Sequence, residues 1–189
     1  MNKQDITELI KSRRSIFPRQ YSGEKIADEI VAEMLETANW APTHKYTEPW
    51  RFKVFRGEAL EKLVGFQKQL YIANTPAEEI KDAKLKVFDE TPLQTSHIIA
   101  IVMHRNPIVP EMEEIASVAM AVQNLWLTVS AYGYGGYWST GNGTFSAAMH
   151  QWLQLDENHQ LMGFFYIGVP AEPLQQGRRR PMDEKVQWM

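Results

Sequence analysis

The stretch His97-Ile-Ile-Ala-Ile-Val-Met-His104 sets an uninterrupted apolar run between two histidines. A strand with one face in water alternates apolar and polar side chains, and this run has no polar position. We therefore expect a strand that is buried on both faces. Residues 162–170, MGFFYIGVP, have the same character and predict a second buried strand.

Segments with apolar residues at helical spacing precede and follow these strands in the sequence. In residues 111–132 the apolar residues occur on nearly all sides of the predicted helix, which is typical of a central helix. Ser22 is a plausible N-cap for the second helix, and Pro42 ends it. Residues 76–90 are only weakly amphipathic and predict an exposed helix or mobile cover. The predicted helices are 5–12, 24–40, 58–70, 111–132 and 146–153, and further strands are predicted at 51–55 and after the glycines of 132–138.

Helices and strands alternate along the chain, which predicts a sheet covered by helices on both sides. The 189 residues contain no repeat and no dividing linker, so we expect one domain over residues 1–189. Six tryptophans and eight phenylalanines indicate a large flat apolar surface that a core, a partner or a planar ligand must cover.

Charge and composition exclude several classes of function. The chain has 20 basic and 23 acidic residues and a net charge of −3, which argues against nucleic-acid or membrane binding. It has no cysteine, which excludes disulfides, thiol nucleophiles and cysteine-based zinc sites. The first residues lack a signal-peptide pattern, and no apolar run is long enough to cross a bilayer, so we expect a cytoplasmic protein.

The segment SRRSIFPRQYS, residues 12–22, places Arg13, Arg14 and Arg19 just after the first predicted helix. One interpretation is a solvated helix end, where positive charge is favourable. The other is a clamp for an anion, because a guanidinium donates two hydrogen bonds to adjacent phosphate oxygens. A second basic cluster at residues 178–180 could converge on the same anion, and the residues alone leave both interpretations open.

The loop APTHKYTEPW, residues 41–50, carries His44, which could be a general base, a metal ligand or a hydrogen-bond donor. No other histidine or carboxylate stands at ligand spacing, so we expect no metal site. The loop suits contact with a polar heterocycle beside Trp50, and an ordinary surface turn is the alternative.

The glycine-rich stretch YGYGGYWSTGNG, residues 132–143, follows a helix and leads into a strand. A dinucleotide fingerprint needs the order strand, glycines, helix, so Rossmann binding is not supported, and neither is a Walker loop. The G-x-S-x-G context of a serine hydrolase is also missing. The glycines more plausibly let backbone amides approach a ligand closely.

Taken in order, these motifs resemble the FMN-dependent nitroreductase family, and most closely its compact branch of NAD(P)H nitroreductases. They are a helix ending in RRS, the A-P-T-H-K…E-P-W-x-F loop, a central helix leading to GYGGYWSTG, the strand GFFYIGVP, and a basic tail before a proline. The resemblance spans nearly the whole chain. It implies an α+β fold with a mixed central sheet flanked by helices, and an intertwined homodimer with one FMN in each interface.

The resemblance also implies how the phosphate end of FMN is held. Arg13, Arg14 and Ser15 match the element that grips the phosphate and the ribityl chain. Arg179, two residues before Pro181, matches a tail arginine that reaches the phosphate. Which arginine of residues 178–180 does so is left open by the sequence.

The same resemblance assigns the contacts with the flavin ring to other segments of the chain. Trp40 and His44 are implied to contact the flavin, partly from the partner subunit. Trp138, Ser139 and Thr140 match residues that lie along the flavin. The positive charge expected near the flavin N1 and O2 atoms could come from Lys45 or from His44.

The chain also departs from the family pattern. Glu48 stands where many members have glutamine, and no Glu-Gly pair for the flavin N5 is evident. Hydrogen bonding to the flavin edge and substrate preference are therefore open. The helix 111–132 and the tail ending in Trp188 are implied dimer contacts.

The implied activity is an NAD(P)H-dependent FMN oxidoreductase that transfers hydride through flavin N5, in a ping-pong cycle, to nitroaromatic or related small-molecule acceptors. No side chain need act as a nucleophile or obligatory acid. Alternatives are a flavin enzyme acting on quinones, enals, semialdehydes or halogenated aromatics, a non-catalytic flavin-binding protein, and a binding module without a cofactor. The sequence does not decide between NADH and NADPH or identify the physiological acceptor.

Overall fold

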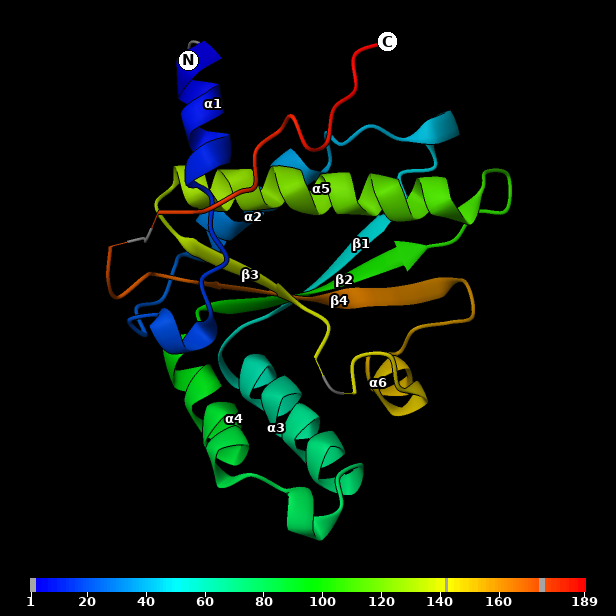
Figure 1. Ribbon diagram of the computed structural model, residues 1–189. Coiled ribbons are helices and arrows are strands. Elements are labelled where there is room, and N and C mark those ends of the chain that lie inside the picture. The colour runs from blue at the N-terminus through cyan, green and yellow to red at the C-terminus, as the bar shows by residue number, and fades with distance from the viewer. Residues whose placement is uncertain (1–2, 142, 174–175) are drawn as a thin grey trace.

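A computed structural model describes residues 3–141, 143–173 and 176–189 of the protein. In this part of the chain, a four-stranded sheet has the order β1-β2-β4-β3, and each neighbouring pair of strands is antiparallel (Figure 1). The strands are β1 (Trp50–Phe55), β2 (His97–His104), β3 (Gly135–Ser139) and β4 (His159–Gly168).

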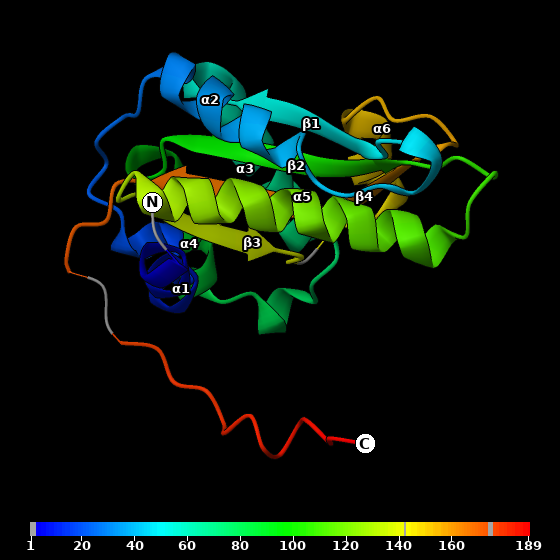
Figure 2. The same ribbon diagram turned by 90° about the horizontal axis from the view of Figure 1, so that it is seen from above.

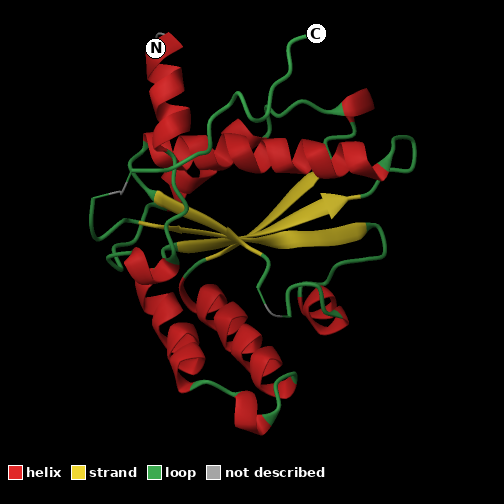
Figure 3. Ribbon diagram, in the orientation of Figure 1, coloured by secondary structure: helices red, strands yellow, loops and turns green. Residues whose placement is uncertain are grey.

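Helices lie on both sides of this sheet, as the alternating pattern predicts (Figure 3). The α-helices are α1 (Lys3–Ser12), α2 (Asp28–Ala38), α3 (Gly57–Ala73), α4 (Asp82–Gln94), α5 (Glu111–Ala131) and α6 (Ala147–Trp152), and the short 3-10 helices are η1 (Pro18–Gln20), η2 (His44–Tyr46) and η3 (Ala77–Glu79).

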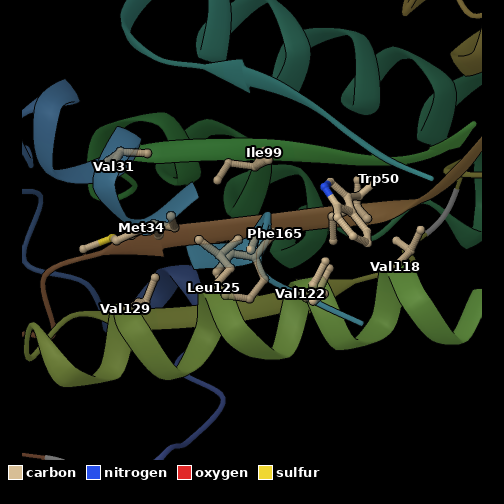
Figure 4. Close-up of a cluster of buried hydrophobic side chains, with 14 of the residues drawn as sticks. Val31, Met34, Trp50, Ile99, Val118, Val122, Leu125, Val129 and Phe165 are labelled. Carbon is tan, nitrogen blue, oxygen red and sulfur yellow. The ribbon is translucent and has the colours of Figure 1, made fainter. Parts of the chain in front are cut away.

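Strand β2 is buried on both faces, which confirms the prediction from its apolar run. Ile99, Ile101 and Met103 pack with α2, α5 and Phe165 in one core. The alternate residues of the strand pack with α3 and α6 in a second core on the opposite face. The first core is drawn in Figure 4, where side chains of α5 point toward Ile99 and Phe165. The sheet therefore separates two apolar layers.

The mixed sheet that the resemblance implies is present only in part. The named strands are antiparallel, and among the described residues parallel pairing is confined to an isolated bridge between Ser15 and Gly136. There the amide of Ile16 donates a hydrogen bond to the Gly136 carbonyl at 3.0 Å. The bridge ties the segment after α1 to the outer edge of β3.

The second helix starts later than its sequence predicts, at Asp28 rather than near residue 24, and Ser22 is not its N-cap. The Ser22 amide instead donates to the carbonyl of Val169 at 2.8 Å, so this residue is tied to the chain after β4. The amide of Ile26 donates to the Ser96 hydroxyl at 2.8 Å. These tertiary hydrogen bonds hold the segment before α2 out of the helix.

The remaining differences lie in the exposed segments. The region predicted as an exposed helix or mobile cover at 76–90 contains η3 and most of α4, and α4 continues to Gln94 with Pro92 inside it. The basic tail runs away from the sheet, and Trp188 is 93% exposed (Figure 2).

Asn142 of the predicted glycine-rich stretch and residues 174–175 of the predicted tail lie outside the described residues. None of the helices in the described ranges has both the length and the apolar character needed to span a bilayer.

A buried histidine joins α2 to the start of β2. His97 is 3% exposed, and its Nε2 lies 3.1 Å from the carboxylate of Asp28. The carboxylate accepts a hydrogen from Nε2, so Nδ1 accepts from the Ser96 hydroxyl at 2.9 Å. Burial lowers the pKa of His97 from its ordinary value of 6.5, and the bond to Asp28 opposes this shift. The neutral ring is therefore the native form.

We predict that this histidine makes stability depend on pH. Because the folded pKa lies below 6.5, the unfolded chain binds more protons as the pH falls through that value. Stability is thus fully present above pH 6.5 and declines below it, by at most about 1.4 kcal/mol per pH unit. Urea unfolding at several pH values should show this slope, and His97→Gln should remove it. An unchanged slope in the variant would contradict the prediction.

Candidate functional site

The guanidinium of Arg13 lies against the outer face of α5. Its Cζ atom is 4.4 Å from the centre of the Trp126 ring, and Trp126 Nε1 donates to the carbonyl of Arg14 at 3.2 Å. Within the described residues, the buried Nη1 atom of Arg13 has no hydrogen-bond partner. Burial and the nearby charges of Arg179 and Arg14 lower the pKa of Arg13. A buried donor without an acceptor, surrounded by like charges, suits an anion.

The tail brings Arg179 to the same place. A cavity of about 460 Å³ between α1 and the tail is lined in part by Lys11, Arg14 and Arg179. A Cβ atom placed on Gly177 would clash with Arg14 Cζ, so the tail backbone passes directly over that guanidinium. Arg14 Nη1 donates to the carbonyls of Lys11 and Arg13 at 2.6 and 2.7 Å, which fixes its position.

Strand β3 leads from these arginines to the next predicted residues. Ser15 pairs with Gly136, and past that bridge the outer edge of β3 has no further strand partner in the described part of the chain. Trp138 Nε1 donates to the Met162 carbonyl at 3.1 Å, so its ring is held against β4. Beyond the bridge, the backbone groups of β3 that face away from β4 are thus open to a ligand.

The neighbouring Thr140 is exposed at the end of β3. It lines an open cavity of about 500 Å³ together with residues of α3 and of the loop after β3, and the lining contains no charged side chain.

A different cavity, of about 370 Å³, lies beneath Ser139 on the α3 and α4 side of the sheet. Its aromatic lining includes the rings of Phe17 and Tyr137, whose centres are 4.6 Å apart. Two cations, Arg19 and Lys84, line it as well, and no acidic residue does. Its lining therefore combines aromatic rings with positive charge.

Gln67 and Tyr166 contribute neutral polar groups to the lining of this second cavity. Burial raises the pKa of Tyr166 to about 12, so its hydroxyl stays neutral and donates to the Gln67 side chain at 3.5 Å. Sequence reasoning missed Lys84, Gln67 and Tyr166 because they come from α4, α3 and β4 and share no local spacing.

Neither Trp40 nor His44 lines any of these three cavities. Trp40 is 80% exposed, and His44 Nδ1 contacts the Glu113 carboxylate at 2.5 Å, at the start of α5. Glu113 and Trp126 are thirteen positions apart in α5, which is about 20 Å along the helix axis. Figure 1 shows η2 and α1 near opposite ends of α5. A single chain therefore does not bring His44 to the arginines.

Lys45, the other candidate cation from the sequence, also lies at this far end. Its Nζ donates to the Ile108 carbonyl at 3.1 Å. The structure places Arg19 and Lys84, rather than Lys45 or His44, beside the edge of β3. In the described ranges, no group of three or more histidine, aspartate or glutamate residues is arranged to hold a metal ion.

The fold and this cation-rich edge define an α+β protein whose candidate site suits an anionic, planar ligand. The sequence profile described as the nitroreductase family matches residues 10–169. YfhC of Bacillus subtilis (strain 168), named provisionally as an NAD(P)H nitroreductase, is 26% identical over 186 residues, covering 95% of this chain and 92% of YfhC.

Two solved structures extend the comparison. A nitroreductase-like family protein from Bacillus cereus superposes with a TM-score of 0.83 at 26% identity, covering 100% of this chain and 98% of that one. A protein from Desulfovibrio desulfuricans, described provisionally as a nitroreductase and solved in complex with FMN, has a TM-score of 0.75, 26% identity and the same coverage. The chain belongs to the nitroreductase family.

The packing of Trp126, whose ring lies under the Arg13 guanidinium, can be tested by a substitution at Gly136. A Cβ atom there would lie 2.6 Å from Phe165 and 2.9 Å from Trp126 Nε1, so we predict that Gly136→Ala lowers the free energy of unfolding by about 1–3 kcal/mol. The matched control is Gly65→Ala in α3, where nothing lies within 4 Å and helix propensity should add about 0.5–1 kcal/mol. Denaturant unfolding measures both, and equal effects of the same sign would refute the prediction.

Proposed function

We propose that the chain is a single-domain, FMN-dependent NAD(P)H oxidoreductase that works as a homodimer. The observation that carries this proposal is the buried, unpartnered Nη1 atom of Arg13 beside Arg14 and Arg179. The FMN complex of the Desulfovibrio relative and the naming of YfhC as an NAD(P)H nitroreductase support the choice of cofactor and electron donor.

The donor set fits a phosphate. Guanidinium groups form charge-assisted, often bidentate hydrogen bonds to phosphate oxygens. The charges of Arg179 and Arg14 disfavour the charged form of Arg13, and a phosphate dianion would remove that penalty. We propose that Arg13, Arg14 and Arg179 hold the phosphate and that Ser15 contacts the phosphate end from the adjacent edge of β3.

We propose that the flavin ring lies along the free edge of β3, beside Trp138, Ser139 and Thr140, with its polar end toward the cavity that contains Arg19 and Lys84. The aromatic lining suits a planar ring, and the cations suit the negative charge that reduction places on its pyrimidine end. Bound FMN would supply the hydride chemistry, accepting hydride from NAD(P)H and passing reducing equivalents to an acceptor. The side chains bind and orient, and none acts as a nucleophile.

A second copy of the chain would complete the site. His44 lies about 20 Å along α5 from Trp126 of its own chain, so we propose that it meets the flavin of the partner subunit, with Trp40 as a further flavin contact. Exposed apolar side chains support association, because Trp40 is 80% and Trp188 93% exposed. We propose that these surfaces are the dimer contacts.

The test of activity is spectroscopic. The protein reconstituted with FMN should lose its yellow absorbance on anaerobic addition of NADH or NADPH and regain it with a nitroaromatic acceptor. Comparison with quinones, enals and semialdehydes then ranks the acceptors. Failure of both nicotinamides to bleach the absorbance would favour a non-catalytic flavin-binding protein, and failure to bind FMN would favour a binding module.

Arg13→Ala should weaken FMN binding about 10- to 100-fold, because it removes charge-assisted hydrogen bonds. Quenching of FMN fluorescence on titration measures the dissociation constant. Arg179→Ala should also weaken binding, whereas Arg180→Ala is the neighbouring control with little expected effect. Wild-type affinity in the Arg13 variant would overturn the phosphate assignment.

Lys84→Gln should lower the midpoint potential of bound FMN by about 20–40 mV, because it removes positive charge near the reduced ring. The matched control is Lys86→Gln on the same helix, whose ammonium group pairs with Glu90 at 3.5 Å. Reductive titration against dyes of known potential measures both variants. Equal potentials in the two would place Lys84 away from the ring.

A further inference from the structure

The loop that carries His44 has an unusual backbone. Lys45, Tyr46 and Glu48 all have positive φ angles, of 52°, 53° and 42°. Side chains with a Cβ atom seldom adopt this left-handed conformation, and it persists only where surrounding contacts enforce it. Such strain is concentrated at functional sites, so the contacts that enforce this conformation indicate the role of the loop.

Two kinds of contact hold this loop. Within it, the Thr43 hydroxyl accepts from the amide of Glu48 at 3.1 Å and lies 3.2 Å from the hydroxyl of Thr47. Outside it, Lys45 Nζ donates to a carbonyl in the turn before α5, and His44 Nδ1 meets the carboxylate of Glu113. The loop is thus clamped onto the first turn of α5.

The pair formed by His44 and Glu113 contributes little to stability. Their side chains are 53% and 44% exposed, and solvent-exposed ion pairs are weak. The contact has a more specific effect on the imidazole ring. A carboxylate can only accept, so the 2.5 Å contact puts the hydrogen on Nδ1. The neutral ring then has a free acceptor at Nε2, in a fixed orientation.

We infer that Glu113 is a positioning residue, which fixes the tautomer and orientation of His44 so that Nε2 accepts a hydrogen bond from a donor group of the cofactor bound to the partner subunit. The inference rests on the proposed function, because it assumes that FMN lies between two copies. It concerns binding and orientation, and Glu113 itself touches no reacting atom.

The first test needs no cofactor. Long-range ¹H–¹⁵N NMR of the free protein at pH 8 should show His44 as the Nδ1-protonated tautomer. Glu113→Ala should shift His44 toward the tautomer mixture of an exposed histidine, and Glu113→Gln should restore the wild-type pattern in part, because an amide oxygen also accepts. The control is Glu111→Ala, since the Glu111 side chain forms no hydrogen bond or ion pair with the described residues. An unchanged His44 tautomer in Glu113→Ala would overturn the inference.

The second test is a double-mutant cycle on the dissociation constant of FMN. Glu113→Ala and His44→Ala should each weaken binding about three- to tenfold, and the double variant should be no weaker than His44→Ala alone. Additive losses would mean that Glu113 acts independently of His44. If wild type binds FMN and Glu113→Ala binds equally well, the inference fails while the proposed function stands. If wild type does not bind FMN, the proposed function itself fails.

Discussion

The burial of β2 on both faces is the constraint from which the rest of the structure follows. A strand with apolar residues on each face needs a helical layer above and below it, and α2 with α5 and α3 with α6 supply these layers. Its neighbours on either side are β1 and β4, so the middle of the sheet is closed to any ligand. The outer strands keep one edge open for recognition, and β3 is the outer strand next to the arginines.

Charge is arranged around that outer strand in a consistent way. Arg13 and Arg14 lie at the start of β3, against the α5 side of the sheet, and two further cations, Arg19 and Lys84, lie past its middle, on the α3 and α4 side. A ligand with an anionic tail and a polar, aromatic head would therefore meet positive charge at both ends. The net charge of −3 hides this arrangement, because it is a sum over the whole chain.

Local patterns predicted the elements, and tertiary contacts explain most of the errors. The apolar run of β2 and the period of α5 are properties of neighbouring residues, and both elements are present. The start of α2 depends on a hydrogen bond from Ser22 to Val169, which no window of sequence contains. In the candidate site, Arg13 and Ser139 stand in recognisable motifs. Lys84 and Glu113 do not, because each gains its significance only from segments that folding brings beside it.

The free edge of β3 also bears on how the chain behaves before any ligand arrives. Unpaired backbone groups at a sheet edge can template strand addition from another molecule and so begin aggregation. Here the exposed strand is only five residues long and begins with two glycines, which makes it a poor template. The edge is therefore open enough for recognition and too short to seed a fibre.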